Sequence, residues 1–238
     1  MKNEEKIEND EIEKVVILTA SGKGGAGKST LTFIAAEKNP EAIILDSDDA
    51  SKSSLQHLAY RNPIPVSFLD NSGRIDRNAF NNMFESIASV DRRLFISDTG
   101  ASVSEQLPMY LESLGANVIS ELLQSFNIKL KIICVVCGKN DFRATMEYLG
   151  KLIESSRGFI EIIAAHNRHF EMSLDQQEKF ELFCNENKIQ YLSYDLLADK
   201  SEMSLRMAAD VLKAGKGLTG LNPFKAIYFR KAIQDLTL

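Results

Sequence analysis

The stretch VVILTASGKGGAGKST, residues 15–30, decides the fold of this 238-residue chain. It opens with an apolar, β-branched run at 15–19, which is typical of a buried strand. Four of the thirteen glycines follow between positions 22 and 27, and a helix-like segment occupies 29–38. The pattern G-x-x-x-x-G-K-[ST] is satisfied by Gly22, Gly27, Lys28 and Ser29. This order of strand, loop and helix predicts a loop that binds phosphate groups.

The residue types in this loop suit that chemistry. Glycines let the backbone curl so that successive N–H groups point at phosphate oxygens, and the following helix N-terminus adds its dipole. Lys28 is expected to reach the β and γ phosphates, Ser29 to ligand Mg²⁺, and Thr30 to contact the α phosphate. The predicted binding residues are Gly24, Gly25, Ala26, Gly27, Lys28, Ser29 and Thr30.

The rest of the chain alternates short apolar runs with longer helix-like segments. Further strands are expected at 42–45, 94–97, 130–137, 159–165 and 190–193, and helices at 76–89, 104–124, 143–154, 176–186, 201–213 and 224–236. Such alternation implies right-handed crossovers and a mostly parallel sheet. The strands are apolar at successive positions, as in strands covered on both sides. We therefore predict an α/β fold, a mostly parallel sheet flanked by helices on both faces.

Composition and charge narrow the class of protein. The chain is 44% hydrophobic and 26% charged, which is ordinary for a soluble globular protein. Of the net charge of −5, −4 falls in residues 1–13, which hold six acids and two lysines. We expect these residues to form a flexible acidic tail before one domain, 14–238. No apolar run is long enough to cross a bilayer and the N-terminus is unlike a signal peptide, so we expect a cytoplasmic protein.

Two further predicted strands are followed by acidic residues. Asp46 and Asp48 follow the second strand, and Asp98 follows the third. In an open parallel sheet, ligands lie beyond the carboxyl ends of the strands, where the glycine-rich loop also lies. We expect Asp98 to hold Mg²⁺ together with Asp46 and Ser29, and Asp48 to orient an attacking water. The alternative for each acid is a helix N-cap or an Asx-turn.

Residues 23–29, KGGAGKS, resemble the deviant Walker A motif K-G-G-x-G-K-[ST] of the ParA/MinD family of P-loop ATPases. Three features agree in the expected order, namely Asp46-x-Asp48, Asp98 in the place of the Walker B acid, and Asn167 at the end of a late strand. The resemblance covers residues 14–200 and implies a SIMIBI-like P-loop NTPase fold. Segment 97–111 is similar to the plasmid conjugal-transfer branch, the TraL-like and StbB-like proteins.

The resemblance implies ATP and Mg²⁺ as cofactors and a homodimer that forms around ATP. Lys23 would be the signature lysine that reaches the partner subunit's nucleotide, with Lys23 and Asp48 as the catalytic residues. Asn167 would read the adenine edge, with Asn140 as a second candidate and helix capping as the alternative for Asn167. Two departures are the short spacing between Lys28 and Asp48, and Asp-Asp-Ala at 48–50 in place of Asp-Pro-Gln. We therefore expect slow hydrolysis.

Three functions stay open at this point. The first is an ATP-driven dimer switch that serves plasmid DNA partition or conjugal transfer, with an unknown protein partner. The second is a small-molecule ligase or kinase of the dethiobiotin synthetase-like type, and the third is a nucleotide-binding scaffold without hydrolysis. Lys23 favours the first, because ordinary kinases need no second loop lysine. Contact with DNA is expected to be indirect, since no helix-turn-helix is evident, and contact with a membrane at most peripheral.

Other motifs receive ordinary structural interpretations. Cys134 and Cys137 have C-x-x-C spacing, but a strand places them on opposite faces, so we predict two core residues. His166 and His169 have no accompanying cluster of cysteines or acids, so we predict no metal site there. Segment 224–236 could lie on a membrane surface, but its modestly basic polar face favours packing on its own domain.

Overall fold

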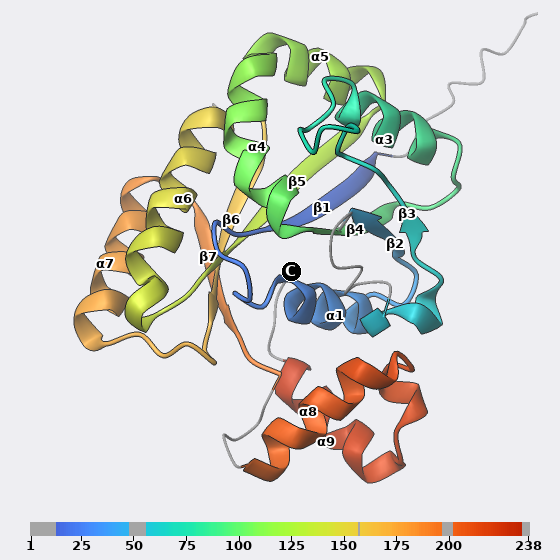
Figure 1. Ribbon diagram of the computed structural model, residues 1–238, viewed down its shortest axis with the longest axis vertical. Coiled ribbons are helices and arrows are strands. Elements are labelled where there is room, and N and C mark those ends of the chain that lie inside the picture. Colours follow the sequence, from blue (N-terminus) through green and yellow to red (C-terminus); the bar gives the residue numbers. More distant parts are fainter. Residues whose placement is uncertain (1–12, 48–55, 157, 197–201, 235–238) are drawn as a thin grey trace, which may run out of the picture.

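The computed structural model describes residues 13–47, 56–156, 158–196 and 202–234. Its centre is a sheet of seven strands in the order β3-β2-β4-β1-β5-β6-β7, every neighbouring pair parallel (Figure 1). The strands are β1 Lys14–Ala20, β2 Ile43–Ser47, β3 Ile64–Pro65, β4 Leu94–Thr99, β5 Ile128–Val136, β6 Glu161–Asn167 and β7 Gln190–Tyr194. The predicted parallel α/β fold is confirmed.

Helices cover both faces of this sheet, as predicted (Figure 1). One face carries α1 Lys28–Lys38, α8 Glu202–Ala214 and α9 Pro223–Gln234. The other carries α3 Ala79–Ala88, α4 Ala101–Leu114, α5 Ala116–Ser125, α6 Phe142–Ser156 and α7 Leu174–Glu186. Short 3₁₀ turns lie at η1 Ala59–Arg61, η2 Lys139–Asp141 and η3 Leu218–Gly220. Each face of the sheet therefore has its own hydrophobic core.

Alternate residues of the central strands supply these two cores. In β1, Ile17 packs with the α1 side, whereas Val16 and Leu18 pack with the α3–α7 side. Because both faces are covered, successive strand residues are buried, which explains the continuous apolar runs in the sequence. Cys134 and Cys137 lie in opposite cores, as predicted, and burial raises the pKa of the Cys137 thiol to about 11.

The structure differs from the sequence prediction in two elements. The single helix expected at 104–124 is two helices, α4 and α5, which meet at Gly115. Gly115 has a φ of 77°, a conformation that glycine adopts without steric cost and that ends the first helix. Strand β3 was not predicted, because it has only two residues, both exposed at the sheet edge, and one of them is proline.

The carboxyl end of α1 is anchored to segments distant in sequence. The Glu37 carboxylate accepts hydrogen bonds from the Tyr60 hydroxyl and from the backbone N–H of Leu218, the latter at 3.1 Å. The Arg61 guanidinium donates to four carbonyls just beyond α1 or in its last turn, those of Ala36, Asn39, Pro40 and Ala42, at 2.7–3.2 Å. Helix α9 also packs against α1. The last turn of α1 is thus held by η1 and by the C-terminal helices.

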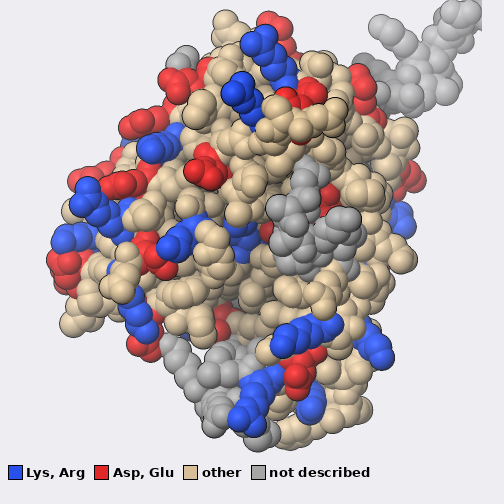
Figure 2. Space-filling model, viewed as in Figure 1, with Lys and Arg blue, Asp and Glu red and all other residues tan. Residues whose placement is uncertain are grey.

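The surface of the protein carries both kinds of charge. Figure 2 shows Lys and Arg interspersed with Asp and Glu, and a group of Lys and Arg over α8 and α9 near the bottom of the view. Within the described ranges, no helix combines the length and the apolar character that a membrane span needs. The acidic tail expected at 1–13 lies outside the described residues, apart from Glu13.

Candidate functional site

The glycine-rich loop joins the carboxyl end of β1 to the amino end of α1, in the middle of the sheet between β4 and β5. Gly22, Lys23, Gly24 and Gly25 are exposed residues, and within the loop the backbone N–H of Lys23 donates to Ser21 Oγ at 3.3 Å. Gly27 precedes the helix with a φ of 99°, and a Cβ there would lie 2.3 Å from Asn167 Nδ2. Only glycine fits that position, because of both its backbone conformation and its contact.

Side chains from the neighbouring strands hold this loop in place. Asn167 Nδ2, at the end of β6, donates to the carbonyl of Ala26 at 2.8 Å, and the Tyr194 hydroxyl, at the end of β7, donates to the carbonyl of Gly27 at 3.0 Å. Ser21 Oγ donates to the Val135 carbonyl of β5 at 3.1 Å. Burial raises the pKa of Tyr194 well above its ordinary value, so the phenol remains a donor. The loop is therefore held in shape before any ligand binds.

Asn167 has a second contact that bears on its predicted role. Its Oδ1 accepts a hydrogen bond from the backbone N–H of His169 at 3.1 Å, and the side chain is buried. Both ends of the amide are thus used within the protein in this structure. Adenine recognition by Asn167 stays a prediction, and bracing of the phosphate loop is the role that its contacts describe.

The two described acids lie side by side next to the loop. Asp46 of β2 is paired in register with Asp98 of β4, which is in turn paired with Thr19 of β1. Neighbouring strands lie about 4.8 Å apart, so these residues form a row across the carboxyl edge. Both carboxyl groups are buried, and Thr19 Oγ1 donates to Asp98 Oδ1 at 3.2 Å. Asp48 lies outside the described residues.

A hydrogen-bonded chain ties the acid on β4 to the helix that follows the loop. Thr19 Oγ1 also lies 2.9 Å from Thr32 Oγ1 of α1, whose single proton goes either to Thr19 Oγ1 or to the carbonyl of Lys28, 3.0 Å away. The position of Asp98 is therefore coupled to the first turn of α1, where Lys28 and Ser29 stand. A cluster of oxygens next to a loop of open N–H groups suits a Mg²⁺ ion bound with phosphate.

The two lysines of the loop lie in different environments. Lys28 is 8% exposed at the start of α1. The side chain of Lys23 is 50% exposed, and its Nζ lies 3.2 Å from Oδ1 of Asp141 in η2. One cation is thus placed inside the phosphate loop, and the other stands at the molecular surface in an ion pair.

Several residues that hold the site were not predicted from the sequence. Tyr148 of α6 packs under Gly22, where an added Cβ would lie 2.7 Å from Tyr148 Cβ, and its hydroxyl donates to the Ser104 carbonyl at 2.6 Å. Tyr194 and Asp141 were also missed. Tyr194 ends a strand at the carboxyl edge, so the rule that selected Asn167 could have found it. For Asp141 and Tyr148 no local sequence signal exists.

The arrangement matches known proteins in fold. No family model matches the sequence, and neither does any curated protein. A plasmid partition protein from Borrelia burgdorferi is similar in structure, with a TM-score of 0.50 and 16% identity over 84% of this chain and 97% of that chain. The signal recognition particle receptor FtsY from Elizabethkingia anophelis has a TM-score of 0.50 and 11% identity over 82% of this chain and 62% of that one. The fold is that of the P-loop NTPases.

Proposed function

We propose that this protein binds ATP with Mg²⁺, forms a homodimer in response, and uses this switch in plasmid DNA partition. The contrast between the two lysines of one loop carries the proposal. Lys28 is buried at the start of α1, where a triphosphate would lie, whereas Lys23 is half exposed and points to the surface. A single lysine suffices to bind the β and γ phosphates. The second lysine is therefore available to a nucleotide in another subunit.

The ion pair of Lys23 supports this role. Exposed ion pairs contribute about 0–1 kcal/mol, so exchange of Asp141 for the phosphates of a partner's nucleotide costs little. Within a closed interface, away from bulk water, the same cation would stabilise negative charge much more strongly.

Lys23 and Asp48 are the proposed catalytic residues. Asp46, Asp98 and Ser29 are the proposed Mg²⁺ ligands, and we expect hydrolysis to be slow without a protein partner.

The cellular role rests on separate support. A plasmid partition protein shares the fold over nearly its whole length, which supports the partition role. Service in conjugal transfer rests on the resemblance of segment 97–111 alone. We therefore propose partition first, with conjugal transfer as the alternative plasmid-linked role.

Light scattering with ADP and with a non-hydrolysable ATP analogue, each with Mg²⁺, tests the dimer switch. We expect a monomer with ADP and a dimer with the analogue. Lys23→Ala should bind the analogue with an affinity lowered only a few-fold and should stay monomeric, because the bridging cations are lost. Lys151→Ala, an exposed lysine on α6, is the matched control and should dimerise. A Lys23→Ala variant that dimerises like the parent would show that Lys23 does not act across an interface.

A further inference from the structure

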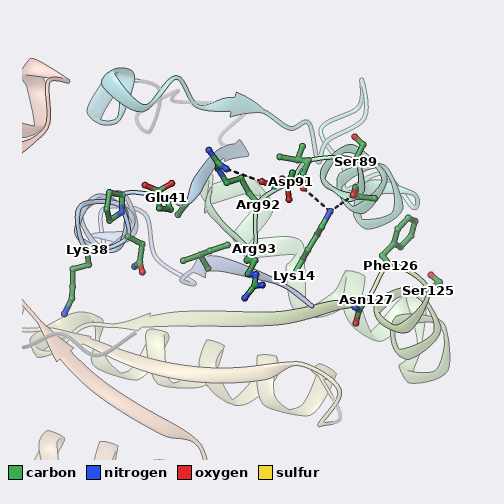
Figure 3. Close-up of a pocket in the computed structure, with 16 residues that line it drawn as sticks. Lys14, Lys38, Glu41, Ser89, Asp91, Arg92, Arg93, Ser125, Phe126 and Asn127 are labelled. Carbon is green, nitrogen blue, oxygen red and sulfur yellow. Dashed lines mark hydrogen bonds between the residues drawn. The ribbon is translucent and has the colours of Figure 1, made fainter. Parts of the chain in front are cut away.

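A cavity of about 930 Å³ opens at the amino edge of the sheet, opposite the phosphate loop (Figure 3). Its wall is built from the start of β1, the turn between α1 and β2, the segment between α3 and β4, and the end of α5. Three helices end at this wall, α1 at Lys38, α3 at Ala88 and α5 at Ser125. The cavity therefore lies where helix C-termini gather, and these ends attract cations.

Part of the positive charge in the wall is explained by those helix ends. The lining has four cations against two acids, Glu41 and Asp91. The Lys14 ammonium donates to the carbonyls of Ile87, Ala88 and Val90, at the end of α3 and just beyond it. Lys14 thus satisfies the end of α3 and does not need a ligand.

The positive charges of Arg92 and Arg93 are not explained by hydrogen bonds to the end of a helix. Both are exposed, and among the residues that the structure describes Arg92 donates only to the carbonyl of its own neighbour Asp91, at 3.3 Å. Within the described ranges, the Arg93 guanidinium has no hydrogen-bond or ion-pair partner. Figure 3 shows the two guanidinium groups in the middle of the lining, directed away from each other. Two cations are therefore presented at separate points of one concave wall.

The exposure of the wall decides which kind of ligand fits it. Sites for small molecules enclose most of the ligand, but most residues that line this cavity are exposed or half-buried. Two arginines that point apart suit an extended ligand with spaced negative charges better than one compact anion. Val90, Leu94 and Phe126 supply half-buried apolar surface between the charges. We propose that this cavity docks an acidic peptide segment of a partner protein, with carboxylates on Arg92 and Arg93 and an apolar side chain beside Phe126.

Fluorescence anisotropy on the full chain tests the docking site. The probe is a labelled, extended peptide with spaced glutamates and two leucines, which matches the separated charges and the apolar surface of the wall. We expect saturable binding that Arg92→Glu with Arg93→Glu weakens at least about tenfold, because both attractive contacts become repulsive. The matched control, Arg74→Glu with Arg77→Glu, changes two arginines outside the cavity and should bind as the parent does. An equal loss in both variants would mean unspecific attraction and would overturn the proposal.

A second experiment tests whether the cavity binds a partner's peptide or the acidic residues near the N-terminus of this chain. In this variant of the full chain, Glu4, Glu5, Glu8 and Glu11 are changed to Gln. Equal peptide affinity in parent and variant supports a cavity open to a partner. Binding seen only in the variant would show that the chain's own N-terminal residues compete for the cavity, and would overturn the assignment to a partner. A peptide with lysines in place of the glutamates should not bind in either protein.

Discussion

The two edges of the sheet are built from opposite ends of the same elements. At the carboxyl edge stand the amino end of α1, a loop of exposed backbone N–H groups and the buried acids Asp46 and Asp98. At the amino edge stand the carboxyl end of α1 and the ends of α3 and α5, with Lys14 and Arg61 bonded to their last carbonyls or to those just beyond. Parallel topology produces this polarity, because every strand and every crossover helix runs in a fixed direction.

Cations serve different purposes at the two edges of the sheet. Lys14 and Arg61 donate to several carbonyl groups at or just beyond the ends of α3 and α1, so they contribute to stability. Lys28 lies at the amino end of α1, where N–H groups favour an anion, so we expect it to add to ligand binding. We therefore expect substitution of Lys28 to weaken nucleotide binding with little loss of stability, and substitution of Lys14 or Arg61 to lower stability with little loss of nucleotide binding.

The largest expected effect is that of Lys28→Ala. Loss of the charge inside the phosphate loop should weaken ATP binding by about 100-fold or more, as for a lost charge-assisted contact. Calorimetric titration with ATP and Mg²⁺ measures it, and the melting temperature should change little. Unchanged affinity for ATP would show that Lys28 is not part of the binding site. It would also contradict the proposed difference between the cations at the two edges.

Arg61→Ala is the matching change at the amino edge. It removes the side-chain hydrogen bonds to four carbonyls at the end of α1, of which Ala36 and Asn39 keep a backbone donor, and should lower the free energy of unfolding by about 2 kcal/mol. For a chain of this size that is a fall in melting temperature of about 4–8 °C, readable by calorimetry. Affinity for ATP should change less than about twofold. Arg77→Ala, an exposed arginine, is the control and should melt like the parent.

Asp98→Asn separates the metal from the phosphate within the carboxyl edge. The carboxylate is expected to act on Mg²⁺, while the loop amides hold phosphate. The gain in ATP affinity on addition of Mg²⁺ should fall by about tenfold, and binding of ADP without Mg²⁺ should persist. Titrations with and without Mg²⁺ give both numbers. A variant that responds to Mg²⁺ like the parent would refute the metal assignment.

Asn167→Ala distinguishes bracing from base recognition. If Asn167 only braces Ala26, its loss should weaken ATP and inorganic pyrophosphate by the same factor, about fivefold for one hydrogen bond. If it reads adenine, only ATP should weaken. The structure favours equal losses, because both ends of the amide are already bonded within the chain. Competition titrations with the two ligands decide between these outcomes.

The last expected effect is the pH dependence of stability behind the loop. Burial raises the pKa of Cys137 from 9.0 to about 11, so the folded state holds this proton more tightly than the unfolded state does. The stabilisation is complete below pH 9 and is lost as the pH rises to about 11. Cys137→Ala should therefore lose less stability over this range, by up to about 1 kcal/mol per pH unit. Denaturant unfolding of the parent and of Cys137→Ala at several pH values measures this difference. If the free energy of unfolding changed equally with pH in both proteins, the result would contradict a desolvated thiol.

Sequence patterns predicted the parts of the molecule that depend on local chemistry. The apolar run of β1, the glycine loop and the acids at or just beyond the ends of β2 and β4 each carry their signal within a few residues, and the structure places the described ones at a single edge. The break between α4 and α5 also has a local signal, Gly115, but the helical periodicity on either side of it hid the change of direction. Strand β3 is too short to have a periodicity at all.

The supports of the site could not be predicted, because they depend on the fold as a whole. Tyr148 meets Gly22 across 126 positions of sequence, and Asp141 meets Lys23 across 118, as their numbers show. Arg61 finds its carbonyls only once η1 lies under the end of α1. Such residues have no special spacing, and each could have been an ordinary surface side chain. The chemistry of the site is local in the sequence, whereas its rigidity comes from distant contacts.

Glu37 gives the helix that follows the phosphate loop a mechanical role. It stands nine residues after Lys28 on the same helix, a distance of about 14 Å along the axis. Because an α-helix of this length is stiff, a shift of its first turn reaches Glu37 with little loss, and Glu37 bonds to Tyr60 and to the backbone at Leu218. One stiff helix, α1, therefore joins the end of the glycine-rich loop to the base of the C-terminal helices.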